Sequence, residues 1–347
     1  MRALAFAIPG DINTLTGGFL YEKRLLEGLR ALGHDVRHIE LDPSFPDPDV
    51  AATTDAVAQL AAIEPARPVI LDGLVFGSLD TAGLARVRAP IVAMIHHPLA
   101  LESGLDPPRA EHLYRTERNN LRHAVHVLVP SPHTRAILID RYGVDKGRIT
   151  VARPGTLPPA GPPRPVDPPL ILSVGIQHPR KGHDVLMHAL ARTTDLAWQA
   201  TVVGKVHDAA HALDLERLMG ALGLRDRVRF AGRVPQEEIG QLYREATLFA
   251  LATRYEGYGI VFDEALVHGL PIVSCATGAV SDTVPPGAGR LVPPDDAAAF
   301  ADALRDLLSD ADARRVAAQT ALEEGRRRPS WQDTARTASR TVSDLPG

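Results

Sequence analysis

Short apolar runs alternate with longer amphipathic stretches from residue 1 to about residue 157. The runs with strand character are Arg2–Ile8, Asp35–Glu40, Pro68–Leu71, Ile91–Ile95, His126–Val129 and Ile149–Ala152. The amphipathic stretches with helical character include Phe19–Leu32, which Gly33 ends, and His112–His123. Alternation of this kind predicts parallel strands joined by crossover helices.

The alternation is interrupted at residues 158–169, a segment rich in proline, and then starts again. Proline lacks an N–H and fixes φ, so this segment is predicted to be a stiff linker. The second series of predicted elements comprises Leu170–Val174, Gly182–Ala191, Gln199–Val203, Asp208–Leu222, Val228–Ala231, Glu237–Ala246 and, after a further strand–helix–strand, Ala297–Leu308. The restart predicts a second domain of the same kind.

The predicted fold is therefore α/β, with two facing doubly wound Rossmann-like domains and an interdomain cleft. We expect the domains to span residues 1–157 and 170–330, and a helix at 331–347 to pack back on the first domain. Ligands bind outside the carboxyl ends of parallel strands, so the cleft is the expected site.

Composition narrows the possible functions and locations of the protein. The formal net charge of −4 argues against a nucleic-acid binder. The single cysteine, Cys275, lies in a predicted buried strand, which favours core packing, no disulfide framework and a reducing, cytoplasmic location. The apolar N-terminal run is too short for a membrane span and lacks a cleavage site.

The most informative chemical pattern is a Gly-Tyr-Gly turn between two glutamates, Glu256 and Glu264. Apolar runs at Ala246–Ala252 and Leu270–Cys275 flank it, which predicts a strand, a glycine turn, a helix and a second strand. A helix N-terminus stabilises a phosphate, whereas carboxylates favour hydroxyl groups. The pattern therefore predicts a site for a sugar attached to a phosphate.

Two further glycine motifs support this interpretation. The predicted strand Leu170–Val174 ends at Gly175, and the cations Arg180 and Lys181 precede the next helix, an arrangement suited to a diphosphate. Gly17-Gly18 stands immediately before a helix, where the backbone can approach a ligand closely or simply enter the helix flexibly. Neither a G-x-G-x-x-G fingerprint nor a Walker A lysine motif is present, which disfavours a dehydrogenase or a kinase.

These motifs resemble those of the retaining glycosyltransferases of family 4, which have a two-Rossmann-domain B-type fold. The resemblance covers nearly the whole chain and is most specific at Ser173–Gly182, Val228–Gln236 and Arg254–Val273. A lesser similarity lies at His96-His97-Pro98. It implies transfer of a sugar from a nucleotide diphosphate sugar, bound by the second domain, to an acceptor hydroxyl of a glycan, lipid or small molecule on the side of the first domain. It implies no cofactor and no metal, and peripheral membrane contact if the acceptor is a lipid.

The resemblance also implies roles for individual residues. Lys181, assisted by Arg180, would neutralise the diphosphate, Glu256 would hold sugar hydroxyls, and Glu264 would hold the ribose. His96 would lie near the sugar and the acceptor. The other implied donor-binding positions are Gly17, Gly18, Gly175, Val234, Gly257, Tyr258, Gly259 and Ile260.

One position departs from the family pattern, which has an arginine where this chain has Ile176. Two alternatives stay open: a nucleotide-sugar epimerase on the same fold, and a non-catalytic sugar-nucleotide-binding protein, which Ile176 makes plausible. Other polar residues receive structural interpretations. We expect Asp263 to be a surface or capping group, Arg326–Arg328 to be solvated, and His178 and His183 to be solvated or structural.

Overall fold

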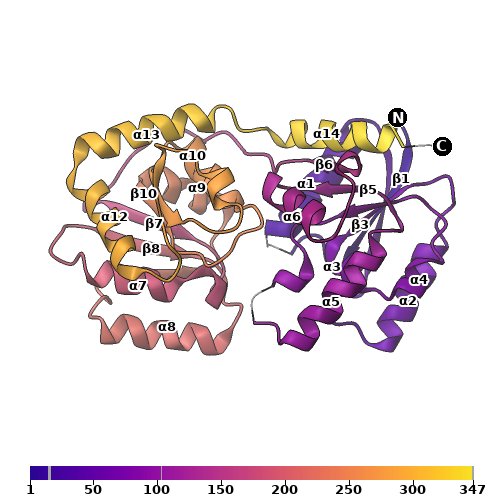
Figure 1. The fold of residues 1–347 in the computed structure, drawn as a ribbon. Helices are drawn as coiled ribbons and strands as arrows, with labels where there is room; N and C mark the ends of the chain where they lie inside the picture. Colours follow the sequence, from indigo (N-terminus) through magenta and orange to yellow (C-terminus); the bar gives the residue numbers. More distant parts are fainter. Residues whose placement is uncertain (15–16, 103, 346–347) are drawn as a thin grey trace. The chain divides into compact units, whose positions relative to one another are not determined.

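The computed structural model describes residues 1–14, 17–102 and 104–345 of the chain. It divides into two compact units (Figure 1). Unit 1 comprises Met1–Gly155 together with Pro329–Gly347, and unit 2 comprises Thr156–Arg328. Each unit is a parallel sheet covered by helices, which is the α/β class that the alternating pattern predicts.

Unit 1 contains one sheet in the order β2-β1-β3-β4-β5-β6, with every neighbouring pair parallel. Its strands are β1 (Ala3–Pro9), β2 (Asp35–Leu41), β3 (Val69–Asp72), β4 (Ile91–Met94), β5 (Ala124–Val129) and β6 (Ile149–Val151). Its helices of nine residues or more are α1 (Gly17–Ala31), α2 (Val50–Ala61), α5 (Pro107–Asn120), α6 (Pro132–Asp140) and α14 (Trp331–Ser343). The shorter helices α3 (Gly73–Ser78) and α4 (Thr81–Leu84) follow β3.

The C-terminal helix α14 packs on α1 within unit 1 (Figure 1). Gly28 of α1 permits this contact, because a Cβ there would lie 2.5 Å from the Cβ of Ala335. Trp331, at the start of α14, meets the ring of Tyr21 edge-on with 5.9 Å between the ring centroids. Unit 1 therefore contains both the first strand and the last helix of the chain.

Unit 2 contains a second all-parallel sheet, in the order β12-β11-β10-β7-β8-β9. Its strands are β7 (Leu170–Val174), β8 (Gln199–Val203), β9 (Val228–Gly232), β10 (Ala246–Leu251), β11 (Ile272–Cys275) and β12 (Gly289–Val292). Its main helices are α7 (His183–Ala191), α8 (Ala209–Ala221), α9 (Gln236–Glu245), α10 (Ile260–Val267), α12 (Ala297–Ser309) and α13 (Ala311–Gly325), with the short α11 (Val280–Thr283) after β11.

Each sheet reverses its strand order at one point, and loops after the strands at that point form a natural ligand site. In unit 1 the reversal lies between β1 and β3, and in unit 2 it lies between β7 and β10. The central strands of each sheet are buried on both faces; residues Leu4 to Ile8 of β1, for example, are wholly inaccessible. Cys275 is buried in β11, as expected for core packing. Among the described helices, none has the length and apolar character needed to cross a membrane.

Several elements have sequences with weaker patterns and were not predicted. Helix α2 is rich in alanine and threonine, and Asp49 caps it by accepting a hydrogen bond from the N–H of Ala52.

Other segments were predicted with different bounds. Helix α5 begins at Pro107, five residues before the predicted start, because Asp106 caps it and proline is favoured in a first turn. The proline-rich segment forms no helix or strand, and Arg164 and Val166 donate backbone hydrogen bonds to Arg244 and Glu245 of unit 2.

Candidate functional site

The loops that follow β7 and β10 bring two cations to one carboxylate at the reversal point of the unit 2 sheet. The loop after β7 forms a single 3-10 turn, Pro179–Lys181, in which the backbone N–H of Arg180 donates a hydrogen bond of 3.1 Å to His178 Nδ1. Lys181 Nζ lies 2.6 Å from Glu256 Oε1, and Arg180 Nη1 lies 3.7 Å from Glu256 Oε2. Three residues singled out by the sequence motifs therefore meet, although 75 positions separate Lys181 from Glu256.

Glu256 is held as an ion in this site. Thr253 Oγ1 donates a hydrogen bond of 3.0 Å to Glu256 Oε1, and the Glu256 side chain is only 6% exposed. Burial alone would raise the pKa of this carboxyl, but Lys181 and then Arg180 outweigh it, so its pKa falls below the ordinary value. Arg180 also donates to the carbonyl of Tyr255 at 3.0 Å, which directs its guanidinium toward Glu256.

Two left-handed glycines shape the backbone around this ion pair. Gly259 has φ +83° and immediately precedes α10; a Cβ there would lie 2.6 Å from the Phe262 ring. Gly182 has φ +63° and precedes α7, and a Cβ there would lie 1.9 Å from the carbonyl oxygen of Ala252. Both positions require glycine. The turn at Gly259 delivers the chain into the N-terminus of α10, where the helix dipole favours an anion.

Glu264, the second glutamate of the pattern, lies on α10. Tyr243 donates a hydrogen bond of 2.8 Å to its Oε2. Burial raises the pKa of Glu264 to about 7, with the charge of nearby Asp263 acting in the same direction. Val234, the position implied to lie near a nucleobase, is half-buried against the core beside this helix.

Asp263 and Arg328 were wrongly expected to be surface groups. Asp263 is buried, and Arg328 Nε lies 3.0 Å from its Oδ1, with side-chain exposures of 7% for Arg328 and 1% for Asp263. A helical step of about 100° separates Asp263 from Glu264, but α10 packs against α13, and Arg328 follows α13 directly. Asp263 therefore faces the protein interior, and Arg328, just after α13, supplies the charge that it needs.

The Asp263–Arg328 pair is connected to the glycine turn. The Tyr258 hydroxyl donates to Asp263 Oδ2. Arg328 also donates 2.6 Å to the carbonyl of Thr283, whose own hydroxyl donates 2.9 Å to the carbonyl of Tyr258. The side chain and the backbone of Tyr258 are thus both held by groups that contact Arg328.

His183, buried beneath the cationic loop, has a pKa lowered by burial to about 4, which agrees with a structural role.

Gly17 and Gly18, the first two residues of α1, are not required to be glycine by packing in the described part of the chain. A Cβ at Gly17 would meet nothing within 4 Å, and one at Gly18 would make an ordinary contact of 3.7 Å with the His96 ring. Among the described residues, no side chain therefore packs against the position of a Gly17 Cβ. His96 follows β4, so both features lie at the carboxyl edge of the unit 1 sheet.

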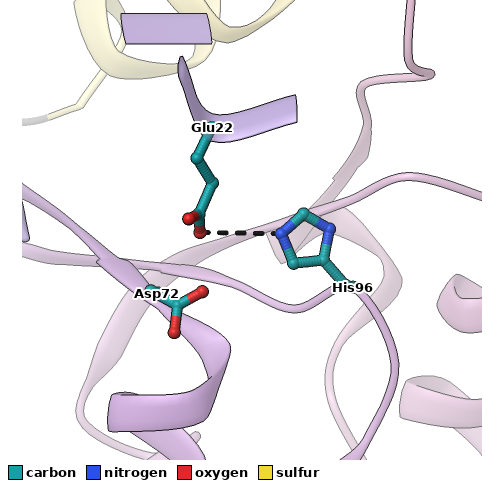
Figure 2. Close-up of side chains that lie close together, drawn as sticks. All are labelled: Glu22, Asp72 and His96. Atoms are coloured by element: carbon teal, nitrogen blue, oxygen red, sulfur yellow. Dashed lines mark ion pairs between the residues drawn. The ribbon is translucent and has the colours of Figure 1, made fainter. Parts of the chain in front are cut away.

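His96 lies beside two buried carboxyl groups that the motifs did not single out, Glu22 and Asp72 (Figure 2). Glu22 comes from α1 and Asp72 ends β3, and His96 Nε2 is 3.6 Å from Glu22 Oε1. Their ligand atoms all lie within 4.8 Å of one another, the one grouping with metal-ligand spacing among the described residues. The available signal was Glu22 itself, a charged residue within the buried stripe of α1.

Burial is the main cause of the pKa shifts of Glu22, Asp72 and His96. It raises the pKa of Glu22 to about 7 and that of Asp72 well above its ordinary value, and the two side chains share a hydrogen bond. Asp72 Oδ1 is already engaged, because it accepts 2.8 Å from the backbone N–H of Leu74 as the cap of α3. Burial lowers the pKa of His96, and the charge of Asp72 opposes that shift.

Two parallel-sheet units, each with polar groups at its reversal point, define a protein of the GT-B type. The fold is shared with sucrose-phosphate synthase from Thermosynechococcus elongatus, with a TM-score of 0.83, 21% identity and 99% coverage of both chains. It is also shared with HepE of Anabaena in complex with UDP and glucose, with a TM-score of 0.77, 17% identity and 99% coverage of both chains.

Sequence comparison identifies the family. Residues 159–324 match the model for glycosyl transferases group 1, and residues 68–156 match that for glycosyltransferase family 4. A D-inositol 3-phosphate glycosyltransferase of Corynebacterium efficiens is 30% identical over 74% of this chain and 66% of its own length. One of Frankia alni is 29% identical over 80% of this chain and 76% of its own. The chain belongs to the group 1 glycosyltransferases of family 4.

Proposed function

We propose that the protein is a retaining, metal-independent glycosyltransferase that moves a sugar from a nucleotide diphosphate sugar to an acceptor hydroxyl. One observation carries the proposal: the Lys181–Glu256 ion pair, 2.6 Å long, beside the glycine turn that opens α10. This places a cation, a carboxylate and a helix N-terminus at one edge of the unit 2 sheet. Those are the three groups needed for a diphosphate joined to a polyhydroxyl ring.

In this proposal the ion pair exchanges partners when the donor binds. The diphosphate takes over Lys181 and Arg180, and Glu256 is released to accept hydrogen bonds from sugar hydroxyls. Because Glu256 is already ionised, it needs no proton transfer before it can accept them. Glu264, one turn into α10, would accept from the ribose, and Val234 would contact the base.

The chemical step then depends on stabilising the leaving diphosphate. Negative charge grows on it as the glycosidic bond breaks, and Lys181, Arg180 and the α10 dipole stabilise that charge without a metal ion. Retention would follow from attack on the same face, with the leaving phosphate accepting the proton of the acceptor hydroxyl. This proton transfer requires no protein carboxylate beneath the anomeric carbon.

The comparisons suggest which compounds to test first. UDP is bound to HepE in its solved structure, so UDP and UDP-glucose are the first donor probes. The relatives are named for D-inositol 3-phosphate, so a phosphorylated polyol is the first acceptor to assay, ahead of glycans and lipids. We place the reaction in the cytoplasm, with peripheral membrane contact only if the acceptor is a lipid.

A non-catalytic sugar-nucleotide binder is the second candidate, favoured by Ile176 at a position where the family has a cation. It would bind donor without turnover. An epimerase would convert donor with no acceptor present. An assay that follows UDP release and sugar identity, with and without acceptor, separates the three functions.

The test is calorimetric titration of UDP and UDP-glucose, with transfer assays, on wild type and on three variants. Lys181→Ala and Glu256→Ala should each lose at least about 100-fold in kcat/KM, since each removes a buried charged contact worth about 3 kcal/mol. Glu264→Ala should chiefly weaken nucleotide binding. Lys146→Ala, an exposed lysine of unit 1, is the matched control. Wild-type turnover in all three site variants would refute the assignment.

A further inference from the structure

We propose that Arg254 is a positioning residue of the donor site, because its guanidinium ties together three segments at the carboxyl edge of the unit 2 sheet and so fixes the place of Lys181 and Arg180. The inference rests on the proposed function, in which these two cations bind the diphosphate. Arg254 contacts no atom of the donor in this proposal. It acts through the turn that carries the two cations.

Arg254 lies in the loop after β10, two residues before Glu256. Its backbone N–H donates a hydrogen bond of 2.8 Å to the carbonyl of Arg180, and its Nη1 donates to the carbonyl of Pro179. One residue therefore binds two successive carbonyls of the 3-10 turn. Since Lys181 comes next in the chain, the turn cannot shift away from the loop after β10 without breaking these bonds.

The same guanidinium binds the helix that follows the turn. Nη1 and Nη2 of Arg254 donate hydrogen bonds of 3.0 and 2.7 Å to the two carboxylate oxygens of Asp184, in the first turn of α7. A forked arginine–carboxylate pair of this kind combines charge with a fixed geometry. Pro179 precedes the two cations in the chain and Asp184 follows them, so Arg254 holds the cationic segment on both sides.

A third segment fixes the plane of the guanidinium. Arg254 Nε donates a hydrogen bond of 2.7 Å to Asp295 Oδ1, in the loop between β12 and α12. Asp295 has φ +60° and is the one left-handed residue other than glycine in the described part of the chain. This conformation costs free energy in a residue with a Cβ, and it persists where surrounding contacts hold the residue. The contact from Arg254 is one that holds it.

The donors of Arg254 are largely occupied by the protein itself. Four of its five N–H groups have acceptors, which are Asp295, Pro179 and the two oxygens of Asp184. An effect of Arg254 on donor binding must therefore pass mainly through Lys181 and its turn. The backbone bond from Arg254 to the Arg180 carbonyl does not depend on the side chain. Substitution of the side chain should consequently loosen the turn without unfolding the unit.

Two substitutions at this position separate bridging from charge. Arg254→Met removes all the side-chain hydrogen bonds, and it should weaken UDP binding at least about tenfold, because a small misplacement of charged groups is costly in a binding site. Arg254→Lys keeps the positive charge, but one ammonium group cannot reproduce the planar fork, so it should lose nearly as much. Wild-type UDP affinity in Arg254→Lys would overturn the proposal, because it would show that charge alone matters.

Arg305→Met is the matched control. Arg305 is also a half-buried arginine of unit 2, and it donates to both oxygens of Asp195 and to the carbonyl of Arg192. Asp195 precedes β8, so this second fork lies toward the amino edge of the sheet. Urea unfolding should show similar losses of stability in the two methionine variants. UDP affinity and kcat/KM should fall only in Arg254→Met, and an equal fall in Arg305→Met would overturn the proposal.

A double-mutant cycle tests whether Arg254 acts through Lys181. Calorimetric titration should show that Arg254→Met weakens UDP binding at least about tenfold in the wild-type background but less than about threefold in the Lys181→Ala background. Non-additivity of this kind is expected only if the two residues act together. Equal losses in both backgrounds would mean that Arg254 acts independently of Lys181, and the proposal would fail.

Hydrogen exchange tests the positioning without any ligand. In the full-length protein, the backbone amides of residues 176–184 should exchange at least about fivefold faster in Arg254→Met than in wild type, and at the wild-type rate in Arg305→Met. An unchanged rate in Arg254→Met overturns the proposal. Should that variant fail to fold, Asp184→Asn, which replaces one acceptor with a donor, must show the faster exchange. Absence of UDP binding by wild type would instead refute the proposed function, while the exchange rates still decide the role of Arg254.

Discussion

Ile176 stands directly after Gly175 in the loop that follows β7, at the position where the resemblance implies an arginine. The structure brings Arg180 toward the same site, since its guanidinium lies 3.7 Å from Glu256 and donates to the Tyr255 carbonyl. Two cations, Arg180 and Lys181, therefore already lie beside Glu256, where we propose that the diphosphate binds. Ile176 is half-buried, and its carbonyl accepts from the N–H of His178, so the backbone there is well fixed.

We predict that Ile176→Arg tightens UDP binding about tenfold, because one added charge-assisted hydrogen bond contributes about 1.5 kcal/mol. The gain should shrink as ionic strength rises. Calorimetry at 50 mM and 500 mM salt measures both effects, with Ile176→Met as the control of similar size. An unchanged affinity would indicate that Arg180 already fills this role. In that case Arg180→Ala should weaken UDP binding more than expected of a residue that only assists Lys181.

At this scale, local motifs were enough to predict Lys181, Arg180 and Glu256, because each lies within a recognisable strand–loop–helix pattern. Glu22 and Asp72 could not be found in the same way. They come from α1 and from the end of β3, and only the strand order brings them to His96. The prediction that Asp263 lies at the surface was wrong because helical geometry gives the direction of a side chain but not which other elements cover it.

The elements were predictable where the pattern was strong. The unit 2 strands Leu170–Val174 and Gln199–Val203 have the bounds expected from their apolar runs. Helix α13 and strand β12 were missed, because α13 is largely alanine and charged residues and β12 is a half-buried strand of four residues. Tertiary packing supplies the stabilisation that such sequences do not show in their patterns.

The connection after α13 has a role that its sequence does not reveal. Arg328 ends unit 2, and Pro329 begins the return of the chain to unit 1. Arg328 holds Asp263 of α10 and the Thr283 carbonyl, and both of these neighbours hold Tyr258 in the glycine turn. The end of one unit is thus linked to the turn that would bind the phosphates.

We predict that Arg328→Met destabilises the protein by about 3–5 kcal/mol, because it leaves the Asp263 carboxylate buried without its partner. The double variant Asp263→Leu with Arg328→Met should recover most of that stability, since it removes both charges. UDP affinity should stay weakened, because Tyr258 has lost its hydrogen-bond acceptor. Urea unfolding and calorimetry measure the two quantities; full recovery of both would show that the pair does not position the turn.

Several buried carboxyl groups make the stability of the protein depend on pH, and three of them can be compared directly. Burial raises the pKa of Glu117 to about 8, and those of Glu22 and Glu264 to about 7. In the unfolded chain these groups ionise near the ordinary value of 4.5. Between about pH 4.5 and 8 the unfolded state therefore holds fewer protons than the folded state, and stability falls as the pH rises.

Glu256 acts in the opposite direction, because its pKa is lowered in the folded state and its contribution is lost as the solution becomes acidic. Above its pKa in the unfolded chain, each group with a raised folded pKa lowers the free energy of unfolding by about 1.4 kcal/mol per pH unit, until its folded pKa is reached. Glu117 permits a clean test, because it lies on α5, outside both candidate sites, and is wholly buried.

We predict that Glu117→Gln flattens the decline in unfolding free energy between pH 5.5 and pH 8.5, since a neutral amide of the same shape replaces a carboxyl that ionises on unfolding. The variant should match or fall slightly below wild type at pH 5.5 and exceed it by at least about 2 kcal/mol at pH 8.5. Urea unfolding at the two pH values measures this. Parallel curves for variant and wild type would mean that Glu117 ionises alike in both states, which would require water or a cation to reach it within the folded unit.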